Sequence, residues 1–398
     1  MTERRSPLYD IHLRTASQMV KGGGAYMFPL TYTSEVEEHI NTRTHVGLQD
    51  LSSMGELDIK GPAAERLLSR LLVNHVYEMH PGQVRYSTLC NDEGYIIDDI
   101  TIYKFSDEHF MLVTSSATRQ KTADWVKSHA VGLGVYVTDQ SAAVALLSVQ
   151  GPRSLAYLKS VVQDVNLDRL RFFRFTNATI NETRLVISRT GYTGELGYEL
   201  YVPADEAAVL WEFITRTGRE FGLRPYGAAA MQSLRIEKAF PLAGPDIDGT
   251  QTPFHVGSLH QYIAFTKREF VGREALLRWQ DAGLDERWVG LELAGELPAK
   301  LGDPIYSVAN ISSFRGKQYS GPEAATYFDR EEAGRVEVGR ITSSAKGHTV
   351  GKVLALGYVQ SAMRGQAKLL VNVGGRPTLA TIVPTPFFAP TGARLRTK

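Results

Sequence analysis

Two adjacent carboxylates, Asp98 and Asp99, lie within the stretch YIIDDITIY at residues 95–103, which otherwise predicts a buried β-strand. Successive side chains of a strand point to opposite faces, so these two acids cannot share one site. The alternation places Asp98 on the apolar face, with Ile96, Ile100 and Ile102. It places Asp99 on a polar face, with Thr101 and Tyr103.

A buried carboxylate without a partner is costly, so each of these acids needs a hydrogen-bond partner or a chemical task. One hypothesis is that backbone amides or an arginine satisfy both acids. The other is that Asp99 faces a ligand, as a proton acceptor or an electrostatic anchor. The strand pattern by itself leaves both hypotheses open.

A third carboxylate, Glu199, lies in a predicted hairpin over residues 185–202 and shares a strand face with Tyr201. A carboxylate presents two parallel acceptors, which match two adjacent N–H donors in one plane. Guanidinium groups present such donors, and so do the ring N–H and amino group of a pterin or guanine. An ion pair with arginine and a bound pterin or guanine are therefore both open for Glu199.

Other chemistry-bearing patterns are weaker. Gly191, Gly194 and Gly197 are spaced like part of a dinucleotide loop, but they precede a strand, so turn glycines with positive φ explain them better. The run at residues 22–24 lacks the Lys-Ser/Thr of a phosphate loop and predicts a bend, or a close approach of backbone to a ligand. The ten histidines form no metal-binding motif, and Cys90 is expected to be a packing residue.

Arg235 and Glu237 lie two positions apart on a predicted helix over residues 227–239. Side chains with this spacing diverge, so each needs a partner of its own. A structural role is therefore favoured over a catalytic role for both.

Composition limits the class of protein. The chain has 398 residues, which predicts two or three domains, and its formal net charge of +1 gives no case for nucleic acid or a membrane surface as a partner. A single cysteine excludes an internal disulfide. The first residues lack the apolar core of a signal peptide, and no apolar run approaches the roughly 20 residues that span a bilayer. A cytoplasmic enzyme or binding protein is expected.

Residue periodicity predicts mixed helices and strands along the chain. Helices are expected at 34–50, 61–73, 118–129, 151–162, 206–222 and 227–239. Strands are expected at 84–89, 95–103, 110–114, 143–149, 289–293, 352–358, 367–373 and 378–383. Short strands separated by Gly and Pro from about Trp288 predict a small all-β C-terminal domain, with an exposed polar insertion at 312–336.

A weak internal duplication links two segments, DIKGPAAE at residues 58–65 and LSVQGPRS at 147–154. In each, a predicted strand runs into Gly-Pro and a helix follows.

Taken in order, the motifs resemble the glycine-cleavage T-protein (aminomethyltransferase) family across almost the whole chain. The matching segments are residues 7–12, 38–39, 47–55, 82–86, 91–99, 150–152, 189–195, 197–199, 233–237, 270–276 and 355–359. The resemblance implies an α+β, three-domain clover-leaf fold with mixed and antiparallel sheets, a small C-terminal β-barrel and a central channel for tetrahydrofolate. It implies a folate-binding region at 1–284 and a barrel domain at 285–398. The first region would hold two interleaved subdomains, roughly 1–50 with 144–240 and 51–143 with 241–284.

The resemblance also implies roles for individual residues. The catalytic aspartate of the family falls on Asp99, and its pterin-binding glutamate falls on Glu199, in agreement with the strand-face argument. Other folate-contact positions fall on Met54, Tyr86, Ser115 and Tyr192. A folate nitrogen would attack an activated one-carbon unit, giving methylene- or methyl-tetrahydrofolate, while the aspartate orients the folate and takes its proton.

Several positions depart from the family pattern. Ser53 stands where members usually carry His, Thr114-Ser115-Ser116 replaces Asn-Ala-Ser, and Met231 replaces a charged arginine. The terminal tyrosine segment becomes PFFAPTGARLR at 386–396. These versions are more similar to the folate domains of dimethylglycine and sarcosine dehydrogenases, although no flavin domain is evident. Methionine cannot bind a carboxylate or phosphate, so a different one-carbon donor is expected.

The preferred hypothesis is therefore a tetrahydrofolate-dependent one-carbon transferase of the aminomethyltransferase or demethylase type, acting on a small N- or O-methylated donor. The first alternative is a glycine-cleavage T-protein that acts on an aminomethyl-lipoyl carrier protein. The second alternative is a non-catalytic, folate-binding regulatory paralogue. No nucleic acid, membrane or metal is expected to take part.

Overall fold

The computed structural model describes residues 3–308, 335–363, 365 and 367–397. The chain forms two compact units. Unit 1 comprises Met1–Met231, Gln261–Ala275 and Gly392–Lys398, and unit 2 comprises Gln232–His260 and Leu276–Thr391. The insertion predicted at 312–336 lies outside the described residues except for 335–336, and the predicted division into domains stays a prediction.

The first sheet of unit 1 has the strand order β6-β7-β8-β5-β9. Its strands are β5 (Gly55–Lys60), β6 (Gln83–Cys90), β7 (Ile96–Ser106), β8 (His109–Thr114) and β9 (Tyr136–Asp139). Two helices pack on one face of it, α3 (Ala64–Leu71) and α4 (Arg119–Ala130). The apolar stripe Leu67, Leu68 and Leu71 of α3 is buried there, as its spacing predicts.

The second sheet of unit 1 has the order β11-β12-β13-β10-β4-β14. Its strands are β4 (Val46–Asp50), β10 (Val144–Gln150), β11 (Phe175–Ile180), β12 (Thr183–Ser188), β13 (Gly197–Pro203) and β14 (Leu223–Pro225). Helices α1 (Tyr9–Thr15), α5 (Ser154–Val161) and α6 (Ala207–Thr217) contribute buried residues to the core on one face. A small sheet of β1 (Arg4–Arg5), β3 (Tyr26–Thr31) and β2 (Gln18–Lys21) completes the unit.

One predicted helix is wrong in its second half. Helix α2 (Glu35–Thr44) ends before residue 45, and residues 46–50 form strand β4 instead of extending the helix to 50. Strand β4 pairs with β10 on one side and β14 on the other. These two pairings bury Val46 and Leu48 completely, so tertiary contacts override the helical periodicity of the segment.

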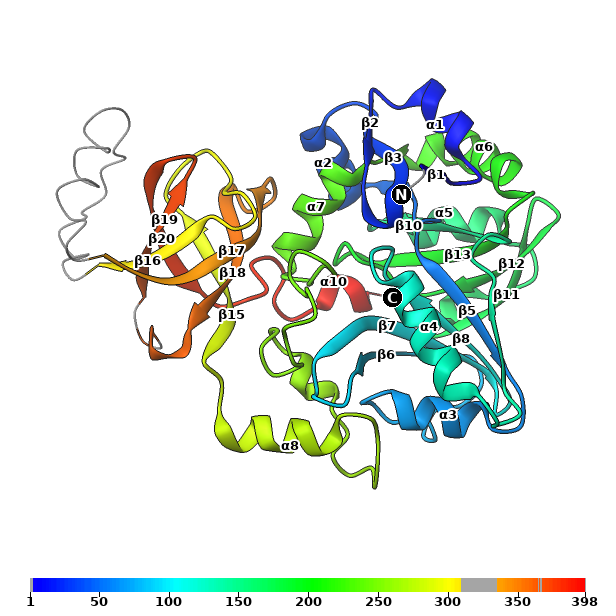
Figure 1. The fold of residues 1–398 in the computed structure, drawn as a ribbon. Helices are drawn as coiled ribbons and strands as arrows, with labels where there is room; N and C mark the ends of the chain where they lie inside the picture. The colour runs from blue at the N-terminus through cyan, green and yellow to red at the C-terminus, as the bar shows by residue number, and fades with distance from the viewer. Residues whose placement is uncertain (1–2, 309–334, 364, 366, 398) are drawn as a thin grey trace. The chain divides into compact units, whose positions relative to one another are not determined.

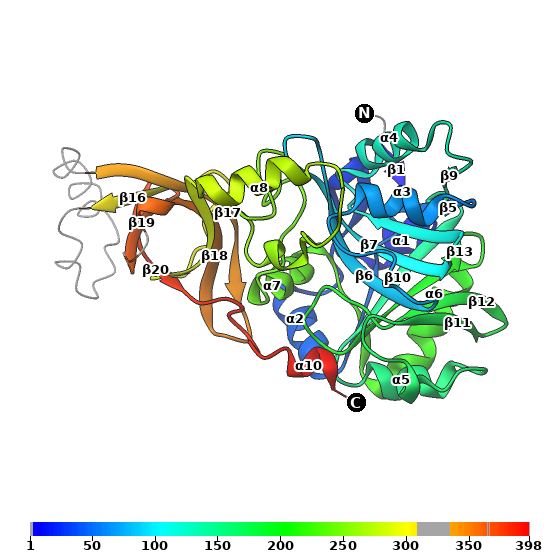
Figure 2. The same ribbon diagram turned by 90° about the horizontal axis from the view of Figure 1, so that it is seen from below.

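The inner faces of the two sheets pack against each other, with the helices outside (Figure 2). The apolar part of this inner layer joins residues of both sheets: Val84, Tyr103, Met111, Val113, Leu146, Phe175 and Tyr201. Alternation along each strand then decides which side chains enter the layer and which enter the helix-covered cores. The candidate site lies on these inner faces.

The predicted duplication has a structural counterpart. Gly61 follows β5 and Gly151 follows β10, with φ of 137° and 128°, and each precedes Pro and a helix. A Cβ on Gly61 would lie 2.2 Å from the Gly134 carbonyl oxygen, and one on Gly151 would lie 2.3 Å from the His45 carbonyl oxygen. Both turns therefore require glycine, and both sheets use the same strand–turn–helix unit.

Unit 2 contains a closed barrel with the strand order β15-β18-β17-β16-β19-β20 (Figure 1). Its strands are β15 (Glu286–Leu293), β16 (Pro304–Val308), β17 (Arg335–Gly347), β18 (Lys352–Gln360), β19 (Lys368–Val373) and β20 (Arg376–Val383). Of the remaining helices, α7 (Ala228–Glu237) and α8 (Arg273–Ala282) each begin in unit 1 and end in unit 2, and α10 (Ala393–Arg396) belongs to unit 1. The predicted α+β class with a C-terminal β-barrel is confirmed.

The barrel unit contains a buried ion pair. Arg235 Nη1 donates to Asp246 Oδ2 at 2.7 Å, and both side chains are fully buried. Glu237, two positions along α7, instead accepts from the backbone N–H groups of Thr349 and Val350. Arg235 and Glu237 therefore have separate structural partners, as predicted.

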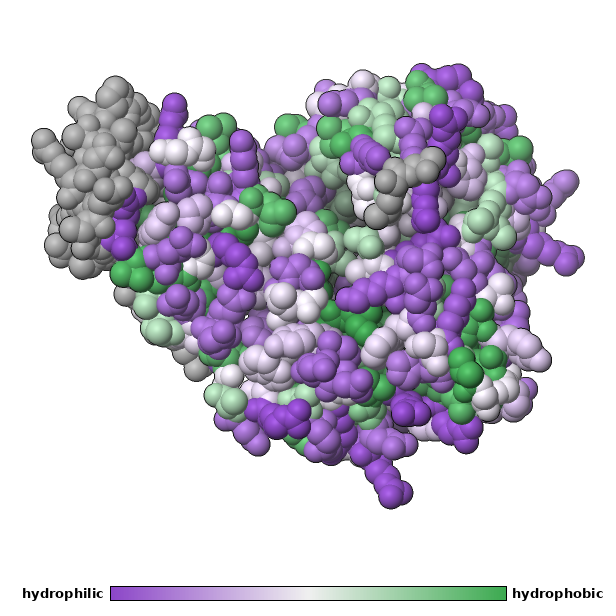
Figure 3. Space-filling model, in the orientation of Figure 1, coloured by the Kyte–Doolittle hydropathy of each residue, from purple (hydrophilic) through white to green (hydrophobic). Residues whose placement is uncertain are grey.

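The surface of unit 1 is mixed in polarity. On the face shown in Figure 3, hydrophilic residues and scattered apolar residues alternate across it. Scattered apolar residues of this kind are normal on a protein surface.

Candidate active site

Asp99 enters the inner layer between the two sheets of unit 1. The half-buried carboxylate accepts a hydrogen bond from the Tyr86 hydroxyl to Oδ2 at 2.8 Å, and one from Ser115 Oγ to Oδ1 at 3.4 Å. Burial raises the pKa of the Tyr86 phenol, and the charge of Asp99 raises it further, so Tyr86 stays a hydrogen-bond donor. Three residues that the sequence analysis selected are thus brought together.

Asp98 points to the opposite face of β7, into the core beneath α4. Its Oδ2 accepts from Thr122 Oγ1 at 2.9 Å and from the Ser115 backbone N–H at 3.3 Å, and its Oδ1 has no hydrogen-bond partner. Burial raises the pKa of Asp98 to about 7, and the neighbouring charge of Asp99 adds to this. The predicted separation of the two acids is correct.

The predicted companions of Asp98 need one correction. The pairing of β6 with β7 shifts by one residue between Leu89 and Cys90, which is a β-bulge. As a result Ile97, and not Ile96, joins Ile100 and Ile102 in the helix-covered core. Strict alternation from residue 95 could not anticipate this extra residue.

Glu199 enters the same inner layer from the second sheet. Its Oε2 accepts from Thr190 Oγ1 at 2.6 Å and from the hydroxyls of Tyr103 and Tyr201 at 3.4 Å each. Burial raises the pKa of Glu199, and these hydroxyls oppose the rise. Among the described residues no arginine pairs with it and none donates to Oε1, which leaves that oxygen for a planar donor of the kind predicted from the sequence.

Fewer interactions define the positions of the other two predicted folate contacts, Met54 and Tyr192. Met54 packs at the edge of the inner-layer cluster. Tyr192 is half-buried, and its proximity contributes to the raised pKa of Tyr86. The structure therefore places Tyr192 near the Tyr86–Asp99 pair, while Met54 lies beside the apolar part of the layer.

Two residues near this layer were missed by the sequence analysis. The ring of Tyr262 lies 5.1 Å from the ring of Tyr86 in an edge-to-face arrangement. Glu56 is fully buried, neither of its carboxylate oxygens has a hydrogen-bond partner, and burial raises its pKa well above the usual range. Glu56 on β5 pairs with Val113 on β8, so the two side chains lie on the same face of the sheet. Val113 belongs to the inner layer, and Glu56 therefore points into it.

The glycine pattern at 191–197 has a different cause from the one predicted. Of the three glycines only Gly194 has positive φ, at 83°. A Cβ on Gly191 or Gly197 would lie 2.0 or 2.1 Å from Gln150 Oε1, so both are small to admit the Gln150 side chain. Gln150 in turn donates to the carbonyl oxygen of Thr190 and fixes the loop.

Ser53, which departs from the family pattern, contacts Ser116 at the end of the segment that replaces Asn-Ala-Ser. Ser53 Oγ and Ser116 Oγ form a hydrogen bond of 2.7 Å, in which either atom can donate. Nearby, a Cβ on Gly24 would lie 2.8 Å from the Ser116 carbonyl oxygen. The predicted close approach at 22–24 is therefore an approach to the protein's own backbone.

Metal and thiol chemistry find no support in the described parts of the chain. Within them, no group of three or more His, Cys, Asp or Glu side chains is placed to hold a metal ion. Cys90 is buried, and burial raises the pKa of its thiol to about 12. No helix among the described residues is long and apolar enough to cross a membrane.

Comparison with known families identifies the class of protein that carries this arrangement. The family model described as the GCVT N-terminal domain matches residues 8–267, and the glycine cleavage T-protein C-terminal barrel domain matches residues 287–389. The chain belongs to the glycine-cleavage T-protein family. T-proteins are folate-dependent transferases, so the predicted enzyme class and the predicted cofactor, tetrahydrofolate, are confirmed.

Whole relatives agree with this assignment. An aminomethyltransferase from Halothermothrix orenii is 33% identical over 386 residues, which cover 96% of this chain and 99% of the relative. One from Moorella thermoacetica is 34% identical, with 97% and 98% covered. The crystal structure of glycine cleavage system aminomethyltransferase T from Bartonella henselae superposes with a TM-score of 0.84 at 26% identity, covering 98% and 99% of the two chains. The predicted T-protein-like fold is confirmed.

Proposed function

We propose that this T-protein transfers an aminomethyl-level carbon from a lipoyl carrier protein to tetrahydrofolate. In the sequence analysis this was the first alternative to a small methylated donor. Full-length similarity to proteins named aminomethyltransferases now favours it. The same proposal places the protein in the cytoplasm and includes neither nucleic acid nor a membrane among its partners.

One observation carries the proposal: two carboxylates from different sheets enter the same inner layer, and neutral hydroxyl groups meet both. Asp99 is held by Tyr86 and Ser115, and Glu199 is held by three hydroxyls. Because no cation neutralises Glu199 among the described residues, its oxygens keep their capacity to accept from a ligand N–H. These acceptor oxygens fit the N–H and amino donors of a reduced pterin.

In this proposal the Glu199 carboxylate accepts from the pterin N–H and amino groups, with Oε1 as the oxygen to which no described residue donates, and Tyr192 and Met54 contact the folate. The bonds from the transferred carbon to the lipoyl sulfur and to its own amino nitrogen break, and these two groups leave as a thiol and as ammonia. The carbon becomes bonded to two amine nitrogens of the folate. Asp99 takes a proton that the attacking nitrogen loses, which passes on to a leaving group, and opposes positive charge that develops beside it. Tyr86 and Ser115 fix the orientation of the Asp99 carboxylate, which keeps its acceptor oxygen aligned during the transfer.

The test is ammonia release from an aminomethyl-loaded lipoyl carrier protein, with and without tetrahydrofolate. We expect release that depends on tetrahydrofolate and is lost in Asp99→Asn, which keeps the shape of the side chain but not its basicity. The matched control is Asp164→Asn, an exposed aspartate on the surface of unit 1, which should behave as the wild type. Folate-dependent release in the wild type and equally in Asp99→Asn would contradict the proposed role of Asp99.

A second candidate, transfer from a small N- or O-methylated donor, is favoured by one sequence departure. Met231 stands where the family usually carries a charged arginine, and a thioether cannot bind an anionic donor group. Screening methylated small molecules for tetrahydrofolate-dependent demethylation, with folate products identified by mass, tests it. Turnover of such a donor, together with no ammonia release from the loaded carrier, would replace the first candidate with this one.

A further inference from the structure

The last residues of the chain lie against the motif loop at residues 189–195. Helix α10 (Ala393–Arg396) and the loop belong to the same compact unit, although nearly two hundred residues separate them in sequence. The loop carries Tyr192, one of the folate contacts in the proposed function. Contacts at both ends of this loop come from the C-terminal segment, residues 392–397.

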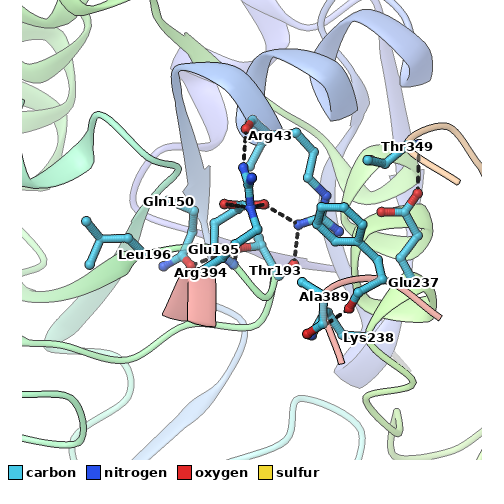
Figure 4. A network of polar contacts seen from close by, with 12 residues as sticks. Arg43, Gln150, Thr193, Glu195, Leu196, Glu237, Lys238, Thr349, Ala389 and Arg394 are labelled. Atoms are coloured by element: carbon cyan, nitrogen blue, oxygen red, sulfur yellow. Dashed lines mark hydrogen bonds and ion pairs between the residues drawn. The ribbon is translucent and has the colours of Figure 1, made fainter. Parts of the chain in front are cut away.

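At one end of the loop, the C-terminal segment adds a half-exposed arginine to the charge cluster around the buried Glu195 (Figure 4). Arg394 Nε lies 2.8 Å from each carboxylate oxygen of Glu195, and Arg394 Nη2 donates to the Arg43 carbonyl oxygen at 2.7 Å. Arg43 Nη1 also donates to Glu195 Oε1 at 3.0 Å and to the Thr193 carbonyl oxygen at 2.6 Å. Two guanidinium groups therefore hold one carboxylate of the loop.

At the other end of the loop, Arg189 bridges to the chain terminus. Its Nη2 donates to the carbonyl oxygen of Thr397 at 2.5 Å, and its Nη1 donates to that of Leu170 at 3.1 Å. Between the two ends, the Gln150 amide donates to the Thr190 carbonyl oxygen and accepts from Thr193 Oγ1. The part of the loop that carries Tyr192 is thus flanked by the contacts of Arg189 on one side and of Glu195 on the other, and Gln150 binds residues on both sides of it.

We propose that the C-terminal segment positions the 189–195 loop for folate binding, with Arg394 as the positioning residue. Arg394 does not touch the reacting atoms; it acts through Glu195 and Arg43 on the loop that presents Tyr192. This inference rests on the proposed function in one respect, that Tyr192 contacts the folate. The ligand class is a reduced folate bound at the inner layer.

The electrostatics of the cluster explain why a terminal residue can have this effect. Glu195 is buried to 1% exposure, and burial raises its pKa while Arg394 and Arg43 oppose the rise. A buried carboxylate with one guanidinium removed is left partly uncompensated, so it turns toward water or takes up a proton. Either response moves the loop, because Arg43 binds Glu195 and the Thr193 carbonyl together.

The experiment compares Arg394→Ala with Arg396→Ala in the full-length chain. Arg396 lies on the same helix, carries the same charge and is exposed, so it is a matched control. Equilibrium binding of tetrahydrofolate and the KM and kcat for transfer are measured for both variants and the wild type. We expect Arg394→Ala to raise the Kd and KM for tetrahydrofolate about tenfold with kcat within about twofold, and Arg396→Ala to match the wild type.

Chemical rescue tests the positioning role directly, because the measured quantity is the Kd for tetrahydrofolate and not the stability of the fold. Guanidinium at low millimolar concentration should lower the Kd of Arg394→Ala toward the wild-type value, and Arg394→Lys should lie between the two because lysine cannot present the same fork. A chain that ends at Thr391 should show the same loss as Arg394→Ala or a larger one. Thermal unfolding of each variant shows that the folded protein is being measured.

Two failures are distinguishable. If Arg394→Ala is folded and binds tetrahydrofolate as tightly as the wild type, the positioning role is overturned while the proposed function stands. If kcat falls and the Kd is unchanged, the segment does not act through folate binding and the inference is also wrong. If the wild type itself binds no tetrahydrofolate, the proposed function fails first.

Discussion

Asp246 in unit 2 and the two candidate acids in unit 1, Asp99 and Glu199, are held by different kinds of partner. In unit 2, Asp246 receives the Arg235 guanidinium at 2.7 Å and also the hydroxyls of Thr342 and Ser343. In unit 1, Asp99 and Glu199 receive hydroxyl groups of tyrosine, serine and threonine. The first arrangement pairs the carboxylate with a fixed positive charge, whereas the second orients it through neutral hydroxyl donors.

This difference changes what each carboxylate contributes to the protein. A carboxylate paired with a guanidinium in a dry core contributes a fixed contact, and removing either partner leaves an uncompensated charge. Glu199, held by neutral donors, keeps one carboxylate oxygen to which no described residue donates, and burial raises its pKa. Glu195, held by Arg43 and Arg394, belongs to the first kind although it lies in unit 1.

The largest expected effect is on Asp99. Asp99→Ala should lower the rate of transfer to tetrahydrofolate by about 1,000-fold or more, because the proton acceptor is lost and Tyr86 and Ser115 have nothing to orient. Thermal unfolding should show that the fold is intact, since the side chain is only half-buried. Near-normal turnover by a folded Asp99→Ala would remove Asp99 from the mechanism and weaken the distinction drawn above.

The next effect concerns the structural acid. Asp246→Ala should lower the free energy of unfolding by about 3–5 kcal/mol, because it leaves the Arg235 charge buried without its partner. The double variant Arg235→Met/Asp246→Leu should recover much of that loss, since no charge then remains in the core. Urea unfolding of the three proteins measures both effects. A loss under 1 kcal/mol in the single variant would mean that this pair is not the structural contact assumed here.

A smaller effect is expected for the second functional acid. Glu199→Gln should weaken tetrahydrofolate binding by about 1–3 kcal/mol, because one acceptor becomes a donor that faces a donor. The hydroxyls of Thr190, Tyr103 and Tyr201 can reorient toward the remaining amide oxygen, so the fold should be kept. Fluorescence titration with tetrahydrofolate measures the change. An unchanged affinity would class Glu199 with the structural acids.

Local patterns predicted most of the elements in unit 1 and the faces of its key strands. The two-residue period of a strand was enough to separate Asp98 from Asp99 and to put Glu199 beside Tyr201. It failed where pairing with distant strands decides the outcome. Strand β4 was predicted as the end of a helix, and strands β16 and β17 of the barrel were not predicted.

The site was predictable only in part, for a similar reason. Asp99 and Glu199 followed from strand faces, while the positions of Met54, Tyr86, Ser115 and Tyr192 came from the family resemblance. Tyr262, Glu56 and the contact between Glu195 and Arg394 depend on segments far apart in the chain. No local spacing encodes such contacts, because burial and pairing are set by tertiary structure.

The last expected effect is a dependence of stability on pH and concerns Asp98, the acid beside Asp99 that enters the apolar core. Its pKa in the folded protein is about 7, above the value of about 3.9 for an unfolded chain. The folded state therefore holds a proton that the unfolded state has released. The stabilisation is fully present below about pH 4 and is lost as the pH rises through 7, with a slope of at most about 1.4 kcal/mol per pH unit.

Asp98→Asn should remove this slope, because an amide does not titrate. Urea unfolding at pH 5, 6, 7 and 8 should show the variant gaining stability relative to the wild type as the pH rises. The control is Asp164→Asn: this exposed aspartate has a lowered pKa, through hydrogen bonds from Thr179, and so stays ionised over the whole range. Its difference from the wild type should be flat. A flat difference for Asp98→Asn as well would show that Asp98 is ionised in the core, which would break the link between neutral partners and shifted acidity in unit 1.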